Sequence, residues 1–407
     1  MIWSAFLHIY QPPWQKKEMT KKIAKQSYWR IVHILEKRPQ AKITLNINGT
    51  LTEQLATNGE MPLLRALGAL AKRGQIEFVG SAKYHAILPL IPRKEAARQI
   101  ELNNLTNKKY FGQWYKPKGF FPPEMCWDNT LAPVLKKFGF EWVVLDEIAV
   151  NPGLKKTNNI TTSCYDGASG LHFFFRSRFA SDLFTTAIVK SADHFLSLIG
   201  KRRTGDILIT AFDGENLGHH SPQMDNRFEE IIEHPSINML THSELFRVCS
   251  DHKRVSPGAS SWSSRPQDIK RGIPYPLWQY PGNTLQKIQW DISNTALRFV
   301  RQKKNEKYGT AQTLLDQALS SDQYWWASAM PWWGVEELLR GTALYLRAVE
   351  AIPLSSSTAA SKKVHRQFVR LETLARLWHS SGKAGKIKKA FLRHESLERF
   401  FGGEKVK

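Results

Sequence analysis

The sequence of 407 residues is poor in cysteine and contains no long apolar run. Its three cysteines, Cys126, Cys164 and Cys249, are odd in number, lie far apart and form no CxxC pair. This pattern supports neither a disulfide framework nor a structural zinc site. Apolar runs such as residues 142–145 are far too short to span a bilayer, so we expect no membrane partner.

A targeting segment is also missing from the first residues, MIWSAFLHIYQPP. They carry no basic leader, and Ser4 and His8 interrupt their short apolar run. We therefore expect neither a secretory signal nor a transit peptide. Together with the cysteine usage, this predicts a cytoplasmic protein.

Acidic residues are scarce relative to basic ones. Lys and Arg number 58 against 36 Asp and Glu, which gives a net charge of +22, and residues 361–407 are basic with a helical pattern. Such a charge permits nucleic acid, an anionic surface or an acidic polymer as partner. No RNP-like, zinc-finger or phosphate-loop pattern accompanies it, so we favour a solvated basic surface and do not expect nucleic acid. The sequence does not indicate an oligomeric state.

What is present is the composition of a globular protein, with 42% hydrophobic and 23% charged residues and a mean hydropathy of −0.40. Apolar stretches of strand length occur at residues 2–7, 43–47, 76–79, 119–121, 142–145, 171–175, 207–212 and 237–240. Helical patterns lie between several of them, at residues 21–37, 61–73, 94–109, 129–138, 192–201 and 226–233. This alternation predicts an α/β protein with a mainly parallel sheet, and about seven such units favour a closed or nearly closed (β/α) barrel.

The pattern changes after this region. Residues 256–282 are rich in Ser, Pro and Gly and predict a loop or linker. Residues 283–407 are helical in pattern and end in a basic helical tail. We therefore expect a catalytic barrel over 1–255, the linker, and a helical domain whose Trp-rich segment, 322–333, contributes to the site.

Polar residues follow the predicted strands at their carboxyl ends, where parallel barrels carry their chemistry. They are His8, Tyr10, Tyr84, His85, Glu124, Asp146, Glu147, Asp213 and Glu215. If the barrel forms, these side chains converge on one bowl. A glycosidase needs two carboxyl groups, one to attack and one to donate a proton, and Glu124 and Asp213 are of the required type. Strand-end carboxylates that cap helices or accept from loop amides fit their positions equally well.

Tryptophan is abundant, with 14 residues, four of them at Trp325, Trp326, Trp332 and Trp333. Flat indoles beside carboxylates suit sugar rings, while packing in a helical core is the alternative for any single one. No HExxH, HxxxH or HxH occurs, so we expect no metal or cofactor, and a metal-dependent deacetylase is disfavoured. The absence of GxSxG disfavours an α/β-hydrolase esterase.

Five segments in order carry a family resemblance. They are HIYQPP (8–13), GQIEFVGSAKYHAILPL (74–90), GFFPPEMCW (119–127), AFDGENLGHH (211–220) and SSDQYWW (320–326). Together they resemble the conserved regions of glycoside hydrolase family 57. The resemblance implies an incomplete seven-stranded (β/α) barrel followed by helices, and retaining activity on α-glucans or related α-glycosides without a catalytic metal.

By motif position, the resemblance implies that Glu124 is the nucleophile and Asp213 the general acid/base, which requires a raised pKa on Asp213. It also implies that the subsites are lined by His8, Tyr10, His85, Trp127, Glu215, Asp322 and Trp325. Three positions differ from other members of the family. Tyr10 stands where many members have a His, and His85 stands where some have an acidic residue. Asn216 stands where several transferases have a Lys.

The sequence therefore predicts a retaining glycoside hydrolase that acts on an α-glucan or oligosaccharide by double displacement. A 4-α-glucanotransferase or branching enzyme on the same scaffold is the main alternative. A non-catalytic binder of glycans or polyanions is a further one.

Overall fold

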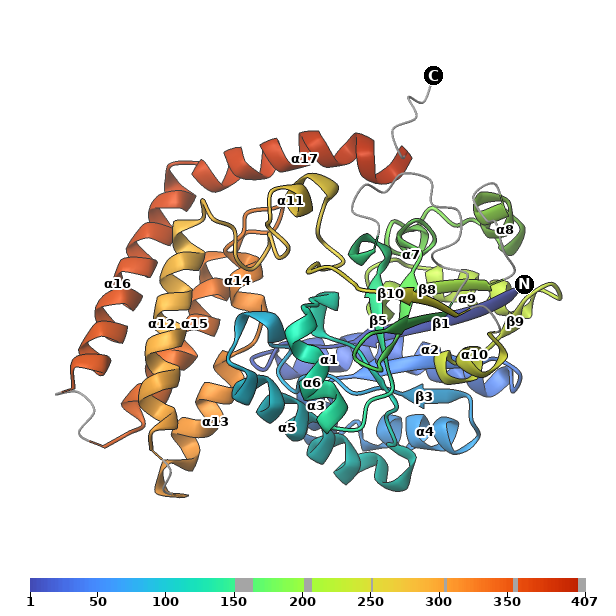
Figure 1. Ribbon diagram of the computed structural model, residues 1–407, viewed down its shortest axis with the longest axis horizontal. Coiled ribbons are helices and arrows are strands. Elements are labelled where there is room, and N and C mark those ends of the chain that lie inside the picture. The colour runs from blue at the N-terminus through green and yellow to red at the C-terminus, as the bar shows by residue number, and fades with distance from the viewer. Residues whose placement is uncertain (151–163, 201–206, 250–251, 304–305, 354–357, 402–407) are drawn as a thin grey trace. The chain divides into compact units, whose positions relative to one another are not determined.

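The computed structural model describes the chain except for residues 151–163, 201–206, 250–251, 304–305, 354–357 and 402–407 (Figure 1). The chain divides into two compact units, Met1–Lys270 and Arg271–Lys407, and the division falls inside the segment predicted to be a linker. The end of the predicted basic tail and the last residue of the helix predicted at 192–201 lie outside the described residues.

The strands of the first unit follow the predicted apolar stretches closely. They are β1 (Ile2–Ile9), β2 (Ile43–Ile47), β3 (Ile76–Phe78), β4 (Gly119–Phe120), β5 (Trp142–Asp146), β6 (Cys164–Gly167), β7 (His172–Arg176), β8 (Ile207–Asp213), β9 (Asn238–Met239) and β10 (His252–Val255). Of these, β6 and β10 were not predicted from the sequence.

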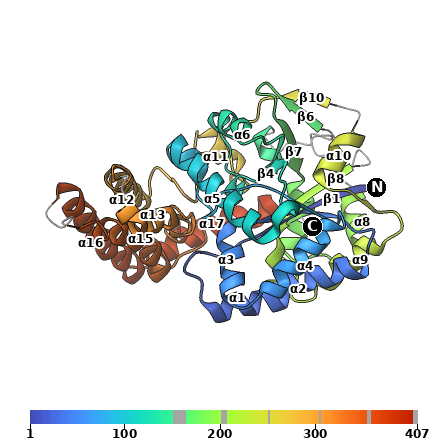
Figure 2. The same cartoon turned by 90° about the horizontal axis from the view of Figure 1, so that it is seen from below.

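The strands form two sheets, ordered β3-β2-β1-β8 with β9 beside β1, and β10-β6-β7-β5-β4 (Figure 2). All pairs are parallel except β6 with β7. A parallel bridge between Gly80 and Phe120 joins the sheets on one side. On the other, Ser177 N donates to Ile209 O at 2.8 Å, from the end of β7 to β8. The strands thus curve into a barrel whose ladder is not closed, in agreement with the predicted α/β class and incomplete barrel.

Helices connect the strands of this unit. They are α1 (Lys17–Ile23), α2 (Trp29–Lys37), α3 (Gly49–Thr57), α4 (Met61–Lys72), α5 (Arg93–Phe111), α6 (Ala132–Lys137), α7 (Arg178–Thr185), α8 (Ala192–Gly200), α9 (Met224–Glu233), α10 (His242–Val248) and α11 (Pro266–Lys270). A π-helix, Ala24–Tyr28, joins α1 to α2 without a break.

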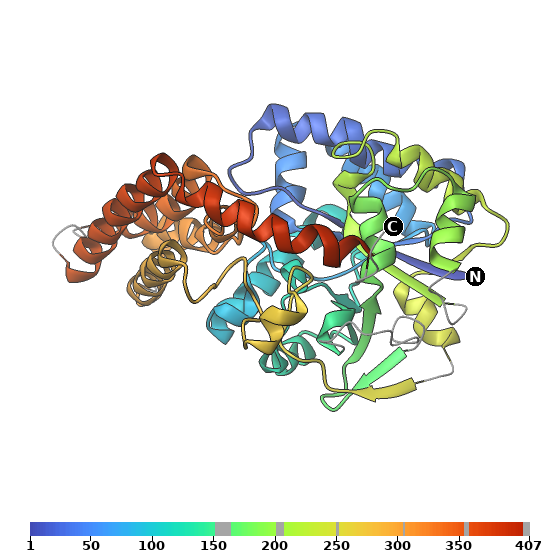
Figure 3. The same cartoon turned by 90° about the horizontal axis from the view of Figure 1, so that it is seen from above.

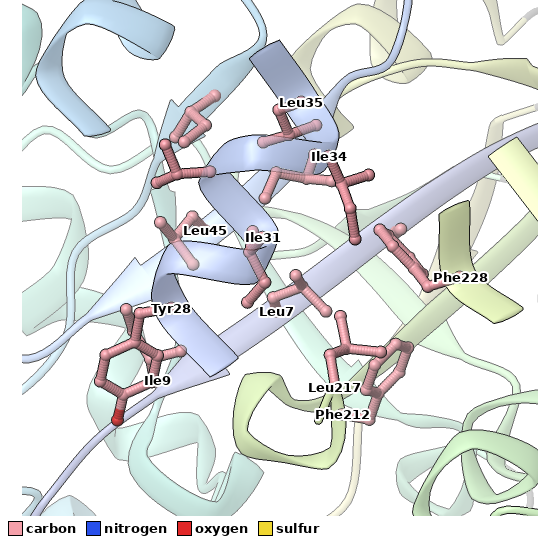
Figure 4. Close-up of a cluster of buried hydrophobic side chains, with 14 of the residues drawn as sticks. Leu7, Ile9, Tyr28, Ile31, Ile34, Leu35, Leu45, Phe212, Leu217 and Phe228 are labelled. Atoms are coloured by element: carbon pink, nitrogen blue, oxygen red, sulfur yellow. The ribbon is translucent and has the colours of Figure 1, made fainter. Parts of the chain in front are cut away.

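Strand β1 is buried on both faces, which is typical of a parallel sheet covered by helices. Because side chains alternate along a strand, Leu7 and Ile9 point outward, toward Ile31 of α2 and Tyr28 (Figure 4). Phe6 points the other way, into a separate inner cluster with Phe121 and Phe174. The same alternation puts His8 on the inner face, at the carboxyl end of the strand.

The second unit is helical. Its elements are α12 (Thr284–Arg301), α13 (Gly309–Ala318), α14 (Asp322–Trp326), α15 (Val335–Glu350), α16 (Ala359–Ser380) and α17 (Lys383–Phe401). Helices α12, α15 and α16 lie side by side in all three ribbon views (Figures 1, 2 and 3). Among the described residues, no helix combines the length and the apolar character that a membrane crossing requires.

Candidate active site

Glu124 lies in a strained turn directly after β4. Its φ is +59°, that of Met125 is +51°, and His85 in a neighbouring loop has φ +57°. Residues other than glycine rarely adopt this left-handed region, at a cost of roughly 1–3 kcal/mol each in sparsely populated conformations. Pro122 and Pro123 precede Glu124 and restrict the backbone that enters the turn. Strain that gathers at one place marks a candidate functional site.

The Glu124 carboxylate is held by a tryptophan from a distant loop. Trp262 Nε1 donates to Glu124 Oε2 at 2.6 Å, and Trp262 N donates to Glu124 O at 3.1 Å. Trp127 and Ser260 form an antiparallel bridge beside them. The first part of the Ser-rich segment predicted to be a linker therefore runs along the Glu124 turn. The Glu124 side chain keeps 19% exposure, so it is open to a ligand.

Asp213 ends β8 and lies on the inner face of the barrel. The parallel register of β1 and β8 places it directly opposite His8. Burial raises the pKa of Asp213 to about 6, and the nearby Arg176 opposes that rise. The direction is the one that the implied acid/base role requires, and its cause is burial.

Glu215, two residues further on, accepts three hydrogen bonds on Oε1. Tyr28 Oη donates at 2.5 Å, Gln11 Nε2 at 3.2 Å and Tyr10 N at 3.2 Å. Burial and the charge of Asp213 nevertheless raise the pKa of Glu215 to about 7. Asp213 and Glu215 therefore form a coupled pair that titrates near neutral pH. Tyr28 comes from the π-helix, a rare element that is frequent at functional sites.

Three nearly parallel rings, those of His8, Tyr10 and His85, form a compact cluster beside these carboxyl groups. The rings of Tyr10 and His85 stack 4.2 Å apart, and those of His85 and His8 lie 5.0 Å apart. His85 Nδ1 is 3.8 Å from Glu124 Oε1. Burial lowers the pKa of His8 to about 4 and also lowers that of His85, so both rings are neutral near pH 7. They are suited to hydrogen bonding with hydroxyl groups rather than to charge pairing.

A buried ionic network supports the wall that carries Trp262. Asp146 Oδ2 accepts from Arg176 Nε at 2.8 Å, and Asp146 Oδ1 accepts from Arg178 Nη2 at 2.8 Å. Arg178 also donates to the backbone oxygens of Trp262 at 3.0 Å and Ser264 at 2.8 Å. The guanidinium of Arg176 lies 5.2 Å from the centre of the Trp262 ring. This network links the ends of β5 and β7 to the loop that holds Glu124.

The structure thus brings together six of the predicted site residues through shared contacts: His8, Tyr10, His85, Glu124, Asp213 and Glu215. Trp127 is fully buried, with its ring against Phe173 at 5.2 Å, so it supports the wall and offers no open face. Trp262, Tyr28, Arg176 and Arg178 are the contributors that sequence reasoning did not assign to the site. Of these four, only Trp262 has a signal in the sequence, because it is a tryptophan in a Ser-rich segment.

Asp322 and Trp325 belong to the second unit. Ser320 Oγ donates to Asp322 Oδ2, and the Trp325 ring stacks on that of Trp332 at 4.8 Å. The indole of Trp332 is 46% exposed. That these residues and segment 322–333 contribute to the site remains a prediction.

A barrel of parallel strands with carboxyl groups at the carboxyl ends of β4 and β8 is an architecture that enzymes use. The model of the family described as Glycosyl hydrolase family 57 matches residues 5–257. The chain belongs to glycosyl hydrolase family 57.

Relatives of known name match parts of the chain. Alpha-amylase 1 of Dictyoglomus thermophilum is 32% identical over 147 residues, which is 36% of this chain and 21% of that protein. A 4-alpha-glucanotransferase of Thermococcus litoralis is 26% identical over 250 residues, which is 58% of this chain and 37% of that protein. The chain thus aligns with well under half the length of these curated relatives.

Solved structures share the fold at low identity. The 4-alpha-glucanotransferase of Thermococcus litoralis superposes with a TM-score of 0.69 at 19% identity, over 86% of this chain and 60% of that chain. A GH57-type branching enzyme of Pyrococcus horikoshii gives a TM-score of 0.69 at 16% identity, over 93% of this chain and 95% of that chain. This likeness shows the fold, including its helical C-terminal part.

The ionic network yields a prediction for stability. Arg178→Met leaves the buried Asp146 carboxylate without one of its two arginines and removes the donor to Trp262 O. We expect a loss of about 1.5–3 kcal/mol in the free energy of unfolding, because the buried carboxylate loses one charged hydrogen-bond donor while Arg176 remains. Arg227→Met, in a more exposed pair with Glu230, is the matched control and should cost less than about 1 kcal/mol. Equal effects of the two variants in urea unfolding would contradict the assigned role.

Proposed function

We propose that this protein is a retaining glycoside hydrolase of α-glucans or related oligosaccharides, with Glu124 as nucleophile and Asp213 as general acid/base. The observation that carries the proposal is the unlike environment of the two carboxyl groups. Burial raises the pKa of Asp213 to about 6, which favours the protonated acid. Glu124 accepts from the indole N–H of Trp262, a bond that favours the ionised form. Acid and nucleophile in glycosidases differ in this way.

In the first step, the ionised Glu124 attacks the anomeric carbon, and protonated Asp213 donates its proton to the departing sugar oxygen. In the second step, Asp213 acts as base and removes a proton from water, which cleaves the glycosyl–Glu124 bond. Such a route requires carboxyl groups about 5–5.5 Å apart. Trp262 keeps Glu124 oriented, and Arg176 limits how far the pKa of Asp213 rises.

The neighbouring rings have a role in substrate binding. Neutral His8 and His85, with Tyr10 stacked on His85, present ring nitrogens and a phenol to sugar hydroxyls. Glu215 has a positioning role, since its Oε1 accepts three hydrogen bonds that tie the segment after β8 to Tyr10, Gln11 and Tyr28. On the family resemblance alone, we assign Asp322 and Trp325 to the subsites nearest the bond that is cleaved.

Transfer to a second sugar is the other candidate function, because relatives carry the names alpha-amylase and 4-alpha-glucanotransferase. The two differ only in the acceptor of the second step, water or a sugar hydroxyl. Incubation with maltopentaose separates them: a hydrolase yields shorter sugars only, whereas a transferase also yields longer chains or branches. An absence of any product from a panel of α-glycosides would overturn both.

Replacement of each carboxyl group should reveal its role. Glu124→Ala and Asp213→Ala should each lower kcat/KM by several orders of magnitude, because each step loses an obligatory group. With an activated aryl α-glycoside and added azide, Glu124→Ala should form the β-glycosyl azide and Asp213→Ala the α-glycosyl azide, since azide replaces the nucleophile in one and water in the other. Glu141→Ala, exposed and paired with Lys118, is the control and should keep full activity. If Glu124→Ala formed the α-glycosyl azide and Asp213→Ala the β-glycosyl azide, the two roles would be reversed.

The coupled pair predicts a pH dependence. Asp213 must be protonated for the first step, so kcat/KM should fall as pH rises through the pKa of this group, about 6. The pKa of Glu215 is about 7, so Glu215 is still mainly protonated at the pH where Asp213 titrates. Glu215→Gln, which also carries no charge there, should therefore leave the basic limb near pH 6, as should Glu141→Gln. A basic limb that moves to lower pH in Glu215→Gln would show that a charged Glu215 raises the pKa of Asp213.

The hydrogen bond to Glu124 can be tested by Trp262→Phe, which keeps a ring but removes the N–H donor. A hydrogen bond to a charged group contributes about 1.5–3 kcal/mol, so kcat should fall about ten- to a hundredfold. Trp114→Phe, at an exposed position, is the matched control. Unchanged turnover in Trp262→Phe, measured with the same glycoside, would show that the bond is dispensable.

A further inference from the structure

A second cluster of titratable side chains lies away from the catalytic carboxyl groups, where β6, β7 and β10 meet (Figures 2 and 3). Asp166 of β6 is directly opposite His172 of β7 in their antiparallel ladder. His252 of β10 is paired with Cys164, two residues before Asp166 on the same strand. Because residues two apart on a strand share a face, Asp166, His172 and His252 all project from one side of the sheet.

The three side chains converge on one oxygen atom. Asp166 Oδ1 is 2.8 Å from His172 Nδ1 and 3.1 Å from His252 Nδ1. The potential ligand atoms of the three residues all lie within 4.8 Å of one another. Their side chains are 43%, 31% and 30% exposed, so an ion has access to them from solvent.

The other nitrogen of His252 shows why this arrangement suits a cation. His252 Nε2 is 3.1 Å from the backbone oxygen of Cys249. A carbonyl oxygen only accepts, so Nε2 carries the proton and donates it. In a neutral ring, Nδ1 then bears a lone pair that faces the carboxylate of Asp166, and two acceptors at 3.1 Å repel. A cation between them removes the repulsion, and histidine ligands of metals commonly donate their second N–H to a carbonyl in this way.

We propose that Asp166, His172 and His252 form a binding site for a zinc ion, with Asp166 Oδ1 and the two Nδ1 atoms as ligands and water completing the coordination. Tetrahedral zinc with bonds of 2.0–2.2 Å sets neighbouring ligand atoms about 3.3 Å apart. The two spacings between Asp166 Oδ1 and the Nδ1 atoms, 2.8 and 3.1 Å, therefore need to widen by only a few tenths of an ångström. Water ligands can come from solvent, to which all three side chains are partly exposed.

The ligand types select the metal. Two imidazoles with one carboxylate suit zinc better than calcium or magnesium, which prefer oxygen ligands. Cys164, Cys249 and His252 form an overlapping group of potential ligands. Both cysteines are buried in the inner cluster. We favour the Asp–His–His set because His252 already directs Nδ1 toward Asp166.

The site has a structural role in this proposal. The ion would tie β10 to β6 and β7, and β10 leads directly into the segment that carries Trp262. Phe246 of α10 packs on the rings of both histidines, at 4.2 Å from His172 and 5.0 Å from His252, and shields one side. Zinc binding at this place is independent of the proposed hydrolase activity.

The test uses the full-length protein, treated with a chelator, dialysed and titrated with zinc chloride by calorimetry. We expect one zinc per chain in the wild type and a rise in the thermal midpoint, since an ion bound only by the folded state stabilises it. His252→Ala and His172→Gln should each weaken zinc affinity at least about tenfold and abolish the thermal shift. His234→Ala, a partly exposed histidine near Asp193, is the control and should bind as the wild type does.

Several results would overturn the site. The site would be excluded if the heat of zinc binding by the wild type were no larger than that of His252→Ala. Equal zinc affinity of the wild type and both variants would also exclude it. A thiolate-to-metal charge-transfer band with cobalt, lost in Cys249→Ser, would assign the cysteines instead. Circular dichroism of the metal-free variants distinguishes a loss of zinc binding from misfolding. If His252→Ala does not fold, His172→Gln still tests the site. Glycoside turnover at low temperature should be the same in His172→Gln and wild type, whether or not the proposed function holds.

Discussion

The alternation of side chains along β1 is the constraint on which the site depends. Leu7 and Ile9 pack outward against helices, so Phe6 and His8 must face inward. The parallel register with β8 then places His8 beside Asp213. A shift of one residue in this register would turn Asp213 toward the outer helices and separate it from His8. The chemistry at the rim therefore rests on the apolar packing beneath it.

Burial acts in opposite directions on the ionisable groups of the site. It raises the pKa values of Asp213 and Glu215 and lowers those of His8 and His85. All four groups are thereby moved toward their neutral forms. The environment of Glu124 differs, because its side chain is partly exposed and accepts a hydrogen bond from the indole of Trp262. One set of walls thus favours neutral forms of the two buried carboxyl groups and the two imidazoles, and leaves Glu124 in a more polar setting.

The sequence predicted the long apolar strands well, because burial dictates both their composition and their structure. Strand β2 has the predicted bounds, 43–47, and β8 differs from its prediction by one residue. Strands β6 and β10, with the sequences CYDG and HKRV, were missed since their partners, rather than their own hydrophobicity, make them strands. Strand-end polarity found Glu124, Asp213 and the stacked rings.

What the sequence did not reveal depends on long-range contacts. Trp262 and Glu124 are 138 residues apart, and no spacing rule joins them. The same holds for Asp166, His172 and His252, which come from three strands and so escape any search for HxxxH or HxH patterns. The Ser-rich segment after β10 was predicted to be a loop or linker from its composition, which cannot reveal that its backbone pairs with the Glu124 turn.

The π-helix at Ala24–Tyr28 has a consequence for how the first helices tolerate change. A π-helical turn contains about one residue more than an α-helical turn. Removal of a single amino acid there would replace it with α-helix and move the hydroxyl of Tyr28 relative to Glu215, which accepts its hydrogen bond. The number of residues in this bend, and not only their identity, therefore sets the position of Tyr28.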